Sequence, residues 1–539
     1  MSLMGFARVD HESGLQPWLA ALARKDLPVL PTTVQRVKAW LEEPDAHVRG
    51  LVEAIEADAA ACAAVLRVAA TADAGRANVG LDELDRILLE LGIHRVVEPV
   101  LEASVLETGV EPNTPRWRAV EEVAIGLHAS AQASWLARRA GVEHPVEVSL
   151  GALFSRLGPL LLWHHVADLP DPLGAWPAVA LAAGCSLDAI EWDLFDFPVQ
   201  ALSSLLAQRW GLRERDRRAV LATCLHDVGQ QTLELSHTLA AAMAHRPRAG
   251  RLETATERAA QLCSEPVAHT RERVLQAAEL ASRRIEEWRW PGLVEGVFQL
   301  AHAKALECPE PGGVQESPAP RVLEDLQLLR GASMQVRLDE AGEARRMEVL
   351  FCGAAPGRGV LVTPRHADWD RLSPDRPLEV CGFSGRFEYR FRSRLVKTFA
   401  QPGRCWLLVY PDAVDVRLVR AAQRVPTALV ASVSARGEAA MTRSLCVDLS
   451  AGGLQLVSAA PLGQIDEVLR IAPTLRLEAG RRHTVLDGRV QHVRVEVETG
   501  LVRTGLSLAE EQDAPSRATL LAFLAERLAW IQEGSGVEH

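Results

Sequence analysis

Hydrophobic residues follow a helical spacing along most of the first 300 positions. A clear example is the set Leu51, Val52, Ile55, Ala59, Cys62, Val65, Leu66 and Ala69. Spacings of three and four residues place such side chains on one face of an α-helix. Proline-containing turns divide the region into short segments. We therefore predict an all-α unit over residues 1–306, with about ten or more helices.

A segment rich in proline and glycine follows the helical region. Its sequence is Cys308-Pro-Glu-Pro-Gly-Gly-Val-Gln-Glu-Ser-Pro-Ala-Pro320. This composition is typical of a semi-rigid linker. We assign residues 307–329 to that linker.

Beyond the linker, apolar residues recur at every second position, which is the period of a β-strand. The expected strands are 334–338, 359–362, 387–392, 405–410, 427–433, 444–447, 454–457, 467–471, 485–492 and 501–508. Short, evenly spaced strands favour small antiparallel barrels. We expect two β-barrel domains, over residues 330–415 and 416–535, so the fold class is multidomain α+β.

A final amphipathic helix is predicted over residues 515–532. The residues expected on its apolar face are Leu520, Leu521, Leu524, Leu528 and Ile531. Pro515 lies near the first turn, where proline is tolerated. This helix completes the second β-domain.

Composition and charge restrict the class of protein. The chain has 539 residues, 48% of them hydrophobic and 24% charged, and a net charge of −11. This length needs more than one core, and the acidic balance argues against a general nucleic-acid binder. The N-terminus lacks the apolar core of a signal peptide, and no run reaches the roughly 18 apolar residues of a membrane span. Nine scattered cysteines without a CxxC pair indicate reduced thiols, so we expect a cytoplasmic protein without membrane insertion.

Five residues between positions 420 and 453 stand out from the acidic background. Arg420 and Arg424 are one helical turn apart, and Asp448, Ser450 and Gly453 follow after one predicted strand. Guanidinium groups bind phosphate oxygens or the O6/N7 edge of guanine. Asp448 can accept hydrogen bonds from guanine N–H groups, and Ser450 can bond phosphate. Each half is also compatible with a solvated linker or a hairpin turn, but together they indicate a site for a small dianion with planar bases.

The same residues carry a resemblance to a known family. Arg420-Ala-Ala-Gln-Arg424-Val-Pro and Asp448-Leu-Ser-Ala-Gly-Gly-Leu resemble the two signatures of PilZ domains, bacterial receptors for cyclic di-GMP. The resemblance implies that the two arginines wrap the guanines and phosphates of the ligand. It also implies that Asp448 and Ser450 contact the ligand from the barrel surface, and that Gly453 shapes the turn.

The PilZ resemblance covers roughly residues 416–527. Residues 330–415 are similar, in pattern more than in motif, to the β-domain that precedes PilZ in flagellar-brake proteins. This arrangement places the arginine segment at the junction of the two β-domains. We expect ligand binding to order that segment and to rotate one barrel against the other.

The helical region resembles HDOD domains, which are signalling relatives of the HD metal phosphohydrolases, over about residues 20–280. The similar runs are Leu27-Pro-Val-Leu-Pro31, Leu66-Arg-Val-Ala-Ala-Thr-Ala72 and Leu84-Asp-Arg-Ile-Leu-Leu-Glu-Leu-Gly92. In the active relatives, a Leu-Leu-His-Asp-Ile-Gly run binds metal through imidazole and carboxylate.

The run that matches this metal-binding motif is Leu153-Phe-Ser155-Arg156-Leu-Gly158. Serine is a poor metal ligand, and the fixed positive charge of arginine repels a metal ion. The resemblance therefore implies a degenerate HD site, with no metal and no catalytic residue.

Other histidines leave an alternative open. Leu225-His226-Asp227-Val-Gly229 looks like an HD signature, although it lies downstream of the family's position. A metal-dependent phosphohydrolase or phosphodiesterase that uses His226 and Asp227 is therefore a second hypothesis. His128 and the pair His164-His165 could also bind metal, but lone histidines on helix faces are more often hydrogen-bonded core residues.

The leading hypothesis is a non-enzymatic bacterial signalling protein. It would bind cyclic di-GMP through the PilZ-like barrel, need no cofactor, and relay the signal through the helical domain. The helical domain would contact an unknown protein partner, for which motility, pilus or kinase machinery fits the resembled families. A third hypothesis is a structural interaction protein with a ligand-free barrel, against which the intact arginine pair argues.

Overall fold

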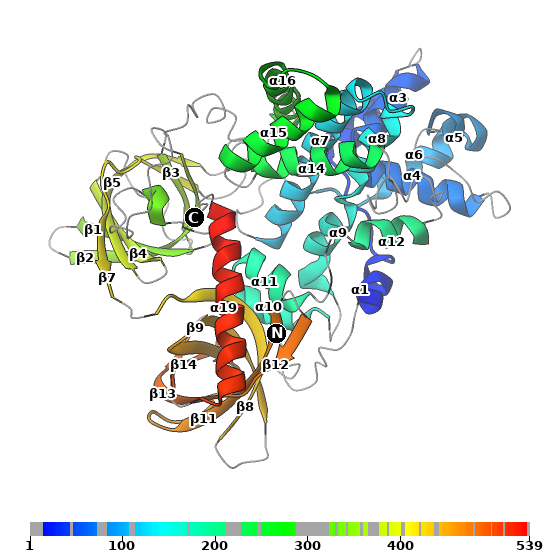
Figure 1. Cartoon of the computed structure of the whole chain (residues 1–539). Helices are drawn as coiled ribbons and strands as arrows, with labels where there is room; N and C mark the ends of the chain where they lie inside the picture. Colours follow the sequence, from blue (N-terminus) through cyan, green and yellow to red (C-terminus); the bar gives the residue numbers. More distant parts are fainter. Residues whose placement is uncertain are drawn as a thin grey trace.

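The computed structural model describes most of the chain as three units, a helical unit and two β-barrels (Figure 1). The described residues are 15–43, 47–72, 84–106, 114–169, 173–195, 197, 199, 201–210, 228–244, 249–286, 323–326, 328, 332–340, 343–355, 359–364, 377–384, 387–399, 405–419, 422–435, 441–477, 480–496, 499–509 and 512–535. The fold class predicted from the sequence is confirmed.

The helical unit is built from short helices, as the proline-divided pattern predicts. They are α1 (Leu15–Leu22), α2 (Pro31–Glu42), α3 (Val48–Glu56), α4 (Ala59–Ala72), α5 (Leu84–Leu91), α6 (Ile93–Glu102), α7 (Pro115–Arg139), α8 (Pro145–Phe154), α9 (Leu157–His165), η3 (Val166–Asp168), α10 (Ala175–Ala182), α11 (Leu187–Leu194), α12 (Ala201–Arg209), α14 (Val228–Ala244), α15 (Ala249–Cys263) and α16 (Val267–Glu286).

Helix α7 is the central element of this unit. Thr114 caps its N-terminus by accepting a hydrogen bond from the Trp117 N–H at 3.2 Å, and Pro115 occupies the first turn. Arg138 and Arg139 lie in its last turn, where basic side chains are favourable. The helix packs against α8, α9, α14 and α16. It is therefore buried along most of its length and supports the helices around it.

One stretch of the described residues, 145–168, is apolar and long enough to span a membrane. It is not one straight helix, because α8 ends at Phe154 and α9 begins at Leu157. The most apolar part of the stretch is 78% buried inside the structure. Its hydrophobic side chains therefore form the core of the helical unit, as those of Leu161 and Trp163 do.

The first barrel forms because its strands alternate inward and outward side chains. In β5, Tyr389 and Phe391 are buried while Arg390 and Arg392 are exposed. The strands are β1 (Ser333–Glu340), β2 (Glu343–Ala355), β3 (Gly359–Pro364), β4 (Pro377–Ser384), β5 (Phe387–Phe399), β6 (Cys405–Leu408) and β7 (Asp415–Leu418). Strands β4, β1, β2, β3, β6 and β5 pair in that order, and a β4–β5 pairing closes the barrel.

Three features of the first barrel differ from the prediction. Strands β2 and β4 were not predicted; β2 begins with a charged segment, and a bulge between Phe351 and Gly353 breaks its alternation. Residues 323–328, assigned to the linker, include buried leucines that pack into the barrel core. Strand β7 pairs with β5, so the first sheet extends to Leu418, a few residues past the expected boundary.

The second barrel is closed in the same way. Its strands are β8 (Val425–Ala435), β9 (Thr442–Ser450), β10 (Gly453–Ser458), β11 (Val468–Leu477), β12 (Gly480–His483), β13 (Leu486–Val495) and β14 (Val502–Leu508). They pair in the order β11, β13, β14, β10, β9 and β8, and a β11–β8 pairing closes the ring. The chain crosses from the first barrel to the second between Leu418 and Val425. The two predicted antiparallel barrels are therefore confirmed.

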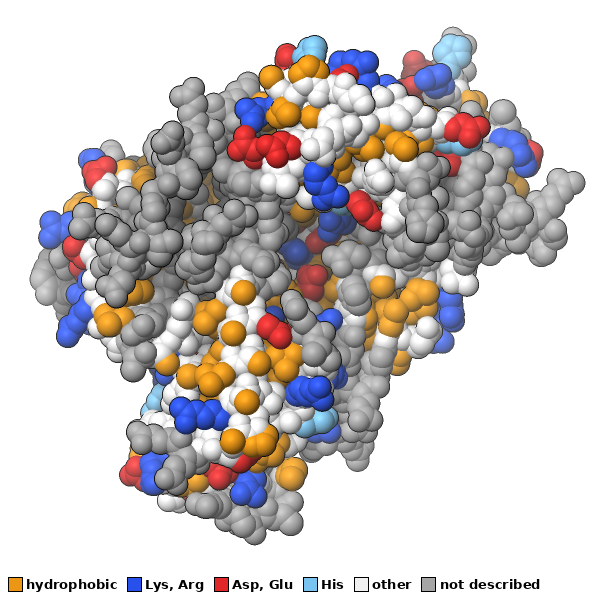
Figure 2. All heavy atoms as spheres, in the orientation of Figure 1, with side chains coloured by type: hydrophobic (Ala, Val, Ile, Leu, Met, Phe, Trp, Pro, Cys, Tyr) orange, Lys and Arg blue, Asp and Glu red, His pale blue; other side chains and the backbone are white. Residues whose placement is uncertain are grey.

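Helix α19 (Ala514–Ser535) covers the second barrel and contacts β11 and β8. Leu520, Phe523 and Leu524 face the barrel core. Leu521 does not, because it lies about 100° around the helix from Leu520, and it is 47% exposed. The predicted helix is confirmed, but Phe523 takes the place that Leu521 was given on its buried face. Apolar side chains are also visible on the outward face of α19 in Figure 2.

Helix α11 of the helical unit docks on β8 of the second barrel. Asp193 near the end of α11 is fully buried, and it accepts hydrogen bonds from the Ala428 N–H at 2.8 Å and from the guanidinium of Arg527. Arg527 also lies over the rings of Trp192 and Phe523. Burial raises the pKa of Asp193, and Arg527 acts against that rise. One carboxylate thus joins the helical unit to both β8 and α19.

Two more arginines of the barrel bind the carboxyl ends of helices in the helical unit. Arg476 of β11 donates to the carbonyl oxygens of Trp192 and Phe195, at 3.2 and 2.8 Å, where α11 ends. Arg503 of β14 donates to the carbonyl oxygen of Ala183 at 2.6 Å, where α10 ends. Carbonyls at a helix end lack partners within the helix, and cations are favourable there. The barrel therefore stabilises two helices of its neighbour.

We expect Asp193→Ala to lower the free energy of unfolding by about 3 kcal/mol or more, because it leaves the Arg527 guanidinium buried without its partner. Urea unfolding followed by circular dichroism measures this change. Glu279→Ala is the control, because it removes one partner of the exposed Arg283–Glu279 pair. That change should lower stability by about 0.5 kcal/mol or less. Equal effects of the two substitutions would contradict the role given to Asp193.

Candidate ligand-binding site

The structure brings together the two sequence motifs of the second barrel. Arg424 immediately precedes β8, and Asp448 lies opposite Pro426 on β9. The Nη1 of Arg424 donates to both carboxylate oxygens of Asp448, at 3.2 and 3.0 Å. The two side chains remain 35% and 26% exposed. A cation and an acceptor therefore lie side by side at a surface that a ligand can reach.

Ser450 and Gly453 hold the turn between β9 and β10. The Ser450 hydroxyl is buried and donates to the carbonyl oxygen of Gly453 at 2.9 Å. A Cβ added to Gly453 would lie 2.6 Å from the carbonyl oxygen of Leu506 on β14. Gly453 is thus needed for the close approach of β14, and its φ is not positive. In this arrangement both residues shape the turn, and contact of Ser450 with a ligand stays a prediction.

Three residues named from the sequence lie outside the part of the chain that the structure describes. They are Arg420, His226 and Asp227. The structure therefore gives no geometry for the first arginine of the predicted clamp or for the alternative HD pair. Asp193, Arg476, Arg503 and Arg527 were not singled out from the sequence. No motif marks them, because each acts through a contact with a distant segment.

A β-bulge connects the Arg424 site to the helical unit. The pairing of β8 with β9 shifts register between Pro426 and Leu429. The Thr427 hydroxyl donates to the carbonyl oxygen of Cys446 at 2.8 Å, and the Ala428 N–H turns to Asp193. A bulge leaves a residue unpaired in the ladder. The bulge therefore supplies the backbone donor that docks α11, four residues after Arg424.

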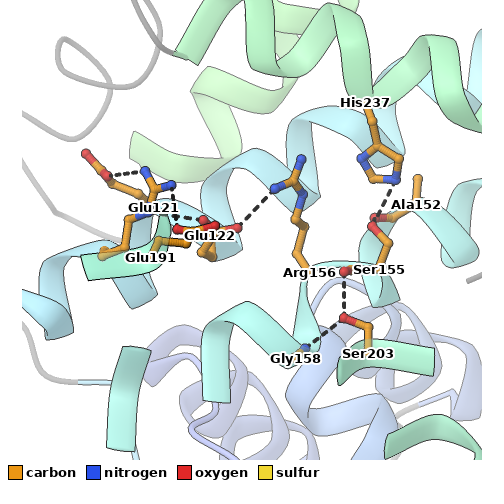
Figure 3. Close-up of polar contacts among 10 residues, drawn as sticks. Glu121, Glu122, Ala152, Ser155, Arg156, Gly158, Glu191, Ser203 and His237 are labelled. Atoms are coloured by element: carbon orange, nitrogen blue, oxygen red, sulfur yellow. Dashed lines mark hydrogen bonds and ion pairs between the residues drawn. The ribbon is translucent and has the colours of Figure 1, made fainter. Parts of the chain in front are cut away.

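The run predicted to be a degenerate HD site forms a polar centre inside the helical unit (Figure 3). Arg156 pairs with Glu122 of α7 at 3.2 Å. Arg118 pairs with the same glutamate at 3.3 Å and with Glu191 of α11 at 3.6 Å. Glu122 is buried, so its charge needs these two arginines. The guanidinium of Arg156 thus neutralises the buried carboxylate of Glu122.

Ser155 and Gly158 of the same run serve packing. The Ser155 hydroxyl donates to the carbonyl oxygen of Ala152 at 2.8 Å, so it accepts from His237 Nε2 at 2.9 Å. His237 Nδ1 is buried and has no hydrogen-bond partner among the described residues. A Cβ added to Gly158 would lie 2.5 Å from Ser203 N, so α9 and α12 approach closely there. The pKa of His237 is lowered to about 3, mainly by burial and also by the positive charge of Arg156.

His128 is a buried, neutral member of a hydrogen-bond chain. The indole N–H of Trp135 can only donate, so Oε1 of Gln132 accepts a hydrogen bond from it at 2.8 Å. Gln132 Nε2 then donates to His128 Nε2 at 3.0 Å and to the carbonyl oxygen of Val274 at 2.9 Å. The Nε2 lone pair of His128 is therefore engaged. Burial lowers the pKa of His128 to about 3.

The remaining histidine pair lies on α9. Nε2 of His165 is 2.9 Å from the carbonyl oxygen of Asp26, and burial lowers the pKa of His165. His164 packs edge to face against His165. Within the described ranges, no three His, Cys, Asp or Glu side chains gather as a group that could hold a metal ion.

Comparison with known families matches two parts of the chain. The family described as HDOD domain matches residues 27–227, and the family described as PilZ domain matches residues 418–526. The first match lies on the helical unit, and the second covers the barrel with Arg424 and Asp448. Both resemblances found in the sequence are therefore confirmed. A comparison with curated proteins gives no match.

Several solved structures are similar to the chain. The Bacillus subtilis inhibitor of motility (MotI/DgrA) is 19% identical, with 38% of this chain and 99% of that chain covered and a TM-score of 0.28. YcgR from Escherichia coli, solved in complex with c-di-GMP, is 14% identical, with 39% and 92% covered and a TM-score of 0.24. The K. pneumonia MrkH-c-di-GMP complex is 11% identical, with 37% and 89% covered and a TM-score of 0.25.

Stability should fall as the pH is lowered from about 6.5 towards 3. His128 and His237 have folded-state pKa values of about 3, below the unfolded value of about 6.5, so the unfolded chain binds more protons in this window. Each histidine then contributes about 1.4 kcal/mol per pH unit to the slope.

His237→Gln tests this pH dependence, because the glutamine amide reaches as far as Nε2 and can still donate to Ser155 but does not titrate. Urea unfolding at several values between pH 4 and 8 gives the slope for both proteins. We expect the variant to lose about 1.4 kcal/mol per pH unit of the slope below pH 6. Identical slopes would show that His237 has the same pKa in the folded and unfolded chains, and would contradict this assignment.

Proposed function

We propose, since the chain contains an HDOD domain over residues 27–227 and a PilZ domain over residues 418–526, that it is a cytoplasmic bacterial receptor for cyclic di-GMP. In this proposal the PilZ domain binds the ligand, and the HDOD domain passes the signal on without catalysis. The observation that carries the proposal is the contact between Arg424 and Asp448 at the surface of the PilZ barrel.

The chemistry of these two side chains fits the proposed ligand. Cyclic di-GMP carries two phosphates and two guanines. A guanidinium can bind phosphate oxygens or the O6/N7 edge of guanine, and a carboxylate can accept from guanine N–H groups. In the structure Arg424 and Asp448 pair with each other. Binding would exchange this exposed ion pair, which is itself worth little, for contacts to the ligand.

The arginine segment joins the two barrels in the sequence, which supports a role in coupling them. Strand β7 belongs to the first sheet and β8 to the second. Arg420 and Arg424 fall in the short connection between these strands. We propose that both arginines close on the ligand together and thereby change the angle between the barrels, through a shift between two arrangements.

A continuous series of contacts supports the proposed relay into the HDOD domain. The bulge at Thr427 and Ala428 follows Arg424 closely, and Ala428 donates to Asp193 of α11. The same helix carries Glu191, which pairs with Arg118 of α7. Helix α11 thus contacts the PilZ domain through Asp193, and it contacts the polar centre of the HDOD domain through Glu191, two residues earlier. A shift of β8 on ligand binding would move α11 and its partners in that centre.

The ion pairs of the polar centre support a non-catalytic HDOD domain. Arg156 places a permanent positive charge next to Glu122, where a divalent cation would need free carboxylates and imidazoles. The lone pair of His128 Nε2 is engaged by Gln132. We propose that ion pairs have replaced metal coordination in this centre and now transmit changes in the position of α11.

Calorimetric titration of the full chain with cyclic di-GMP tests ligand binding. We expect Arg424→Ala to weaken binding by about tenfold to a hundredfold, because a hydrogen bond to a charged group contributes about 1.5–3 kcal/mol. Arg420→Ala should have a similar effect. Arg470→Ala is the matched control, since it breaks a comparable ion pair with Asp487 towards the other end of β8.

Two results of this titration would overturn parts of the proposal. If the wild-type chain gives no heat and no thermal shift at high micromolar cyclic di-GMP, the chain is not a receptor for this ligand. If Arg420→Ala and Arg424→Ala combined leave the affinity unchanged, the ligand binds elsewhere. Binding that Arg470→Ala weakens as strongly as Arg424→Ala would show a nonspecific charge effect.

Hydrogen exchange with and without cyclic di-GMP tests the relay. We expect the exchange rate of amides in α11 and in the first half of β8 to change by at least twofold when ligand binds, because the bulge connects them. Helix α2 serves as an internal reference in the same domain. The change should disappear in Arg424→Ala. A ligand effect confined to the two barrels would contradict the relay through α11.

A further inference from the structure

A groove of about 930 Å³ lies in the helical domain between α3, α7, α8 and α16, and Arg36 of α2 also lines it. These four helices gather at the top of Figure 1. The groove is separate in sequence from the cyclic di-GMP site, and none of its residues belongs to the contacts between α11 and the barrel. Its shape and chemistry are therefore independent of the proposed ligand site.

Two helices line the groove with stripes of equal length. The stripe on α7 runs from Leu127 to Arg138, and the stripe on α16 runs from Arg273 to Arg284. Each spans twelve residues at helical spacing, which corresponds to about 16 Å along the helix axis. This length matches about three turns of a bound helix. An elongated groove of this kind is a common site for an amphipathic helix.

The charge of the groove opposes the charge of the chain as a whole. Its lining contains five arginines and two glutamates, in a protein of net charge −11. Glu53 pairs with Arg49 at 2.9 Å, and Arg273 pairs with Glu265 at 3.4 Å. Glu56 and Arg36 have partners of their own. Arg138 and Arg284 form no ion pair within the described residues. The groove therefore presents unpaired positive charge at one end of each stripe.

Apolar side chains lie between these charges. Leu280 of α16 and Val146 of α8 are 50% and 53% exposed, although both line the groove. Trp135 of α7 is half-buried beside them. Trp and Arg are enriched among the residues that dominate protein–protein interfaces. An apolar strip flanked by arginines is complementary to a helix with an apolar face and acidic flanks.

Hydrogen bonds between the helices hold the groove open before any partner binds. Trp135 donates to Gln132, whose amide donates to the Val274 carbonyl oxygen of α16. The hydroxyls of Ser130 on α7 and Ser149 on α8 lie 2.9 Å apart and share a hydrogen bond. The walls therefore need no rearrangement to receive a partner, which reduces the free-energy loss on binding.

We propose that this groove binds an acidic amphipathic helix of a partner protein. The arginines at its ends are exposed and are not enclosed around one point, which favours a long segment over a single phosphate group. The groove would give the helical domain a contact surface for its output. The inference does not rest on cyclic di-GMP binding, because the groove residues lie apart from the Arg424 site.

A displayed library of random 16-residue peptides, selected on the full chain without nucleotide, tests this inference. We expect the enriched peptides to be negatively charged, with apolar residues at i, i+3 or i+4, and i+7. A synthetic peptide of the enriched sequence should bind at least tenfold more weakly to the Arg138→Glu/Arg284→Glu variant. Arg258→Glu on α15 is the matched control and should stay within twofold. Circular dichroism verifies that both variants are folded.

Each other outcome overturns the proposal. No enrichment, enrichment of peptides without acidic residues, or equal binding to the double variant would show that the groove does not take an acidic helix. If no peptide is enriched but inorganic phosphate or ATP binds the wild type and not the double variant, the groove is a small-anion site. Retained peptide binding in Arg424→Ala separates this result from a failure of the cyclic di-GMP proposal.

Discussion

The buried carboxylate of Asp193 is the constraint on which the arrangement of the domains depends. A charge without partners at this depth would destabilise the folded chain by several kcal/mol. Its partners come from two distant places, Arg527 on α19 and the Ala428 N–H on β8. The helical domain therefore docks only on a barrel whose first strand and C-terminal helix are both in place. The two domains form one cooperative contact although a whole barrel lies between them in the sequence.

This contact gives a physical reason for combining the two domains in one chain. The bulge that frees the Ala428 N–H lies directly after Arg424, so the ligand site and the docking site share a few residues of one strand. Helix α11 then connects Asp193 to Glu191 and, through Arg118, to Glu122 in the polar centre of the helical domain. The groove between α7 and α16 offers a surface through which a change in the helical domain can alter the binding of a partner.

Much of the fold follows from local sequence patterns. The periods of 3.6 and 2 separate the helical unit from the barrels, and the PilZ signatures place Arg424 next to Asp448. The pattern could not show the segment 323–328 packing into a barrel, because a few buried leucines after a proline-rich linker give no period. It also could not show Asp193, Arg476, Arg503 or Arg527, since each has its partner more than 200 residues away. Gly453 was predicted to shape the turn. The position needs glycine because the carbonyl oxygen of Leu506 lies close to it, and only the folded barrel shows this contact.

The most direct test of the account is the affinity for cyclic di-GMP when the docking of α11 is weakened. Thermodynamic linkage requires that, if the ligand alters docking, docking alters ligand affinity by the same factor. Arg527→Met removes the partner of Asp193 without touching Arg424, and Leu521→Ala on the exposed face of α19 is its control. We expect a change in the dissociation constant of about fivefold or more for Arg527→Met alone. Equal affinity in all three proteins would show that ligand binding to the PilZ domain is not coupled to the docking of α11. That result would contradict the proposed relay.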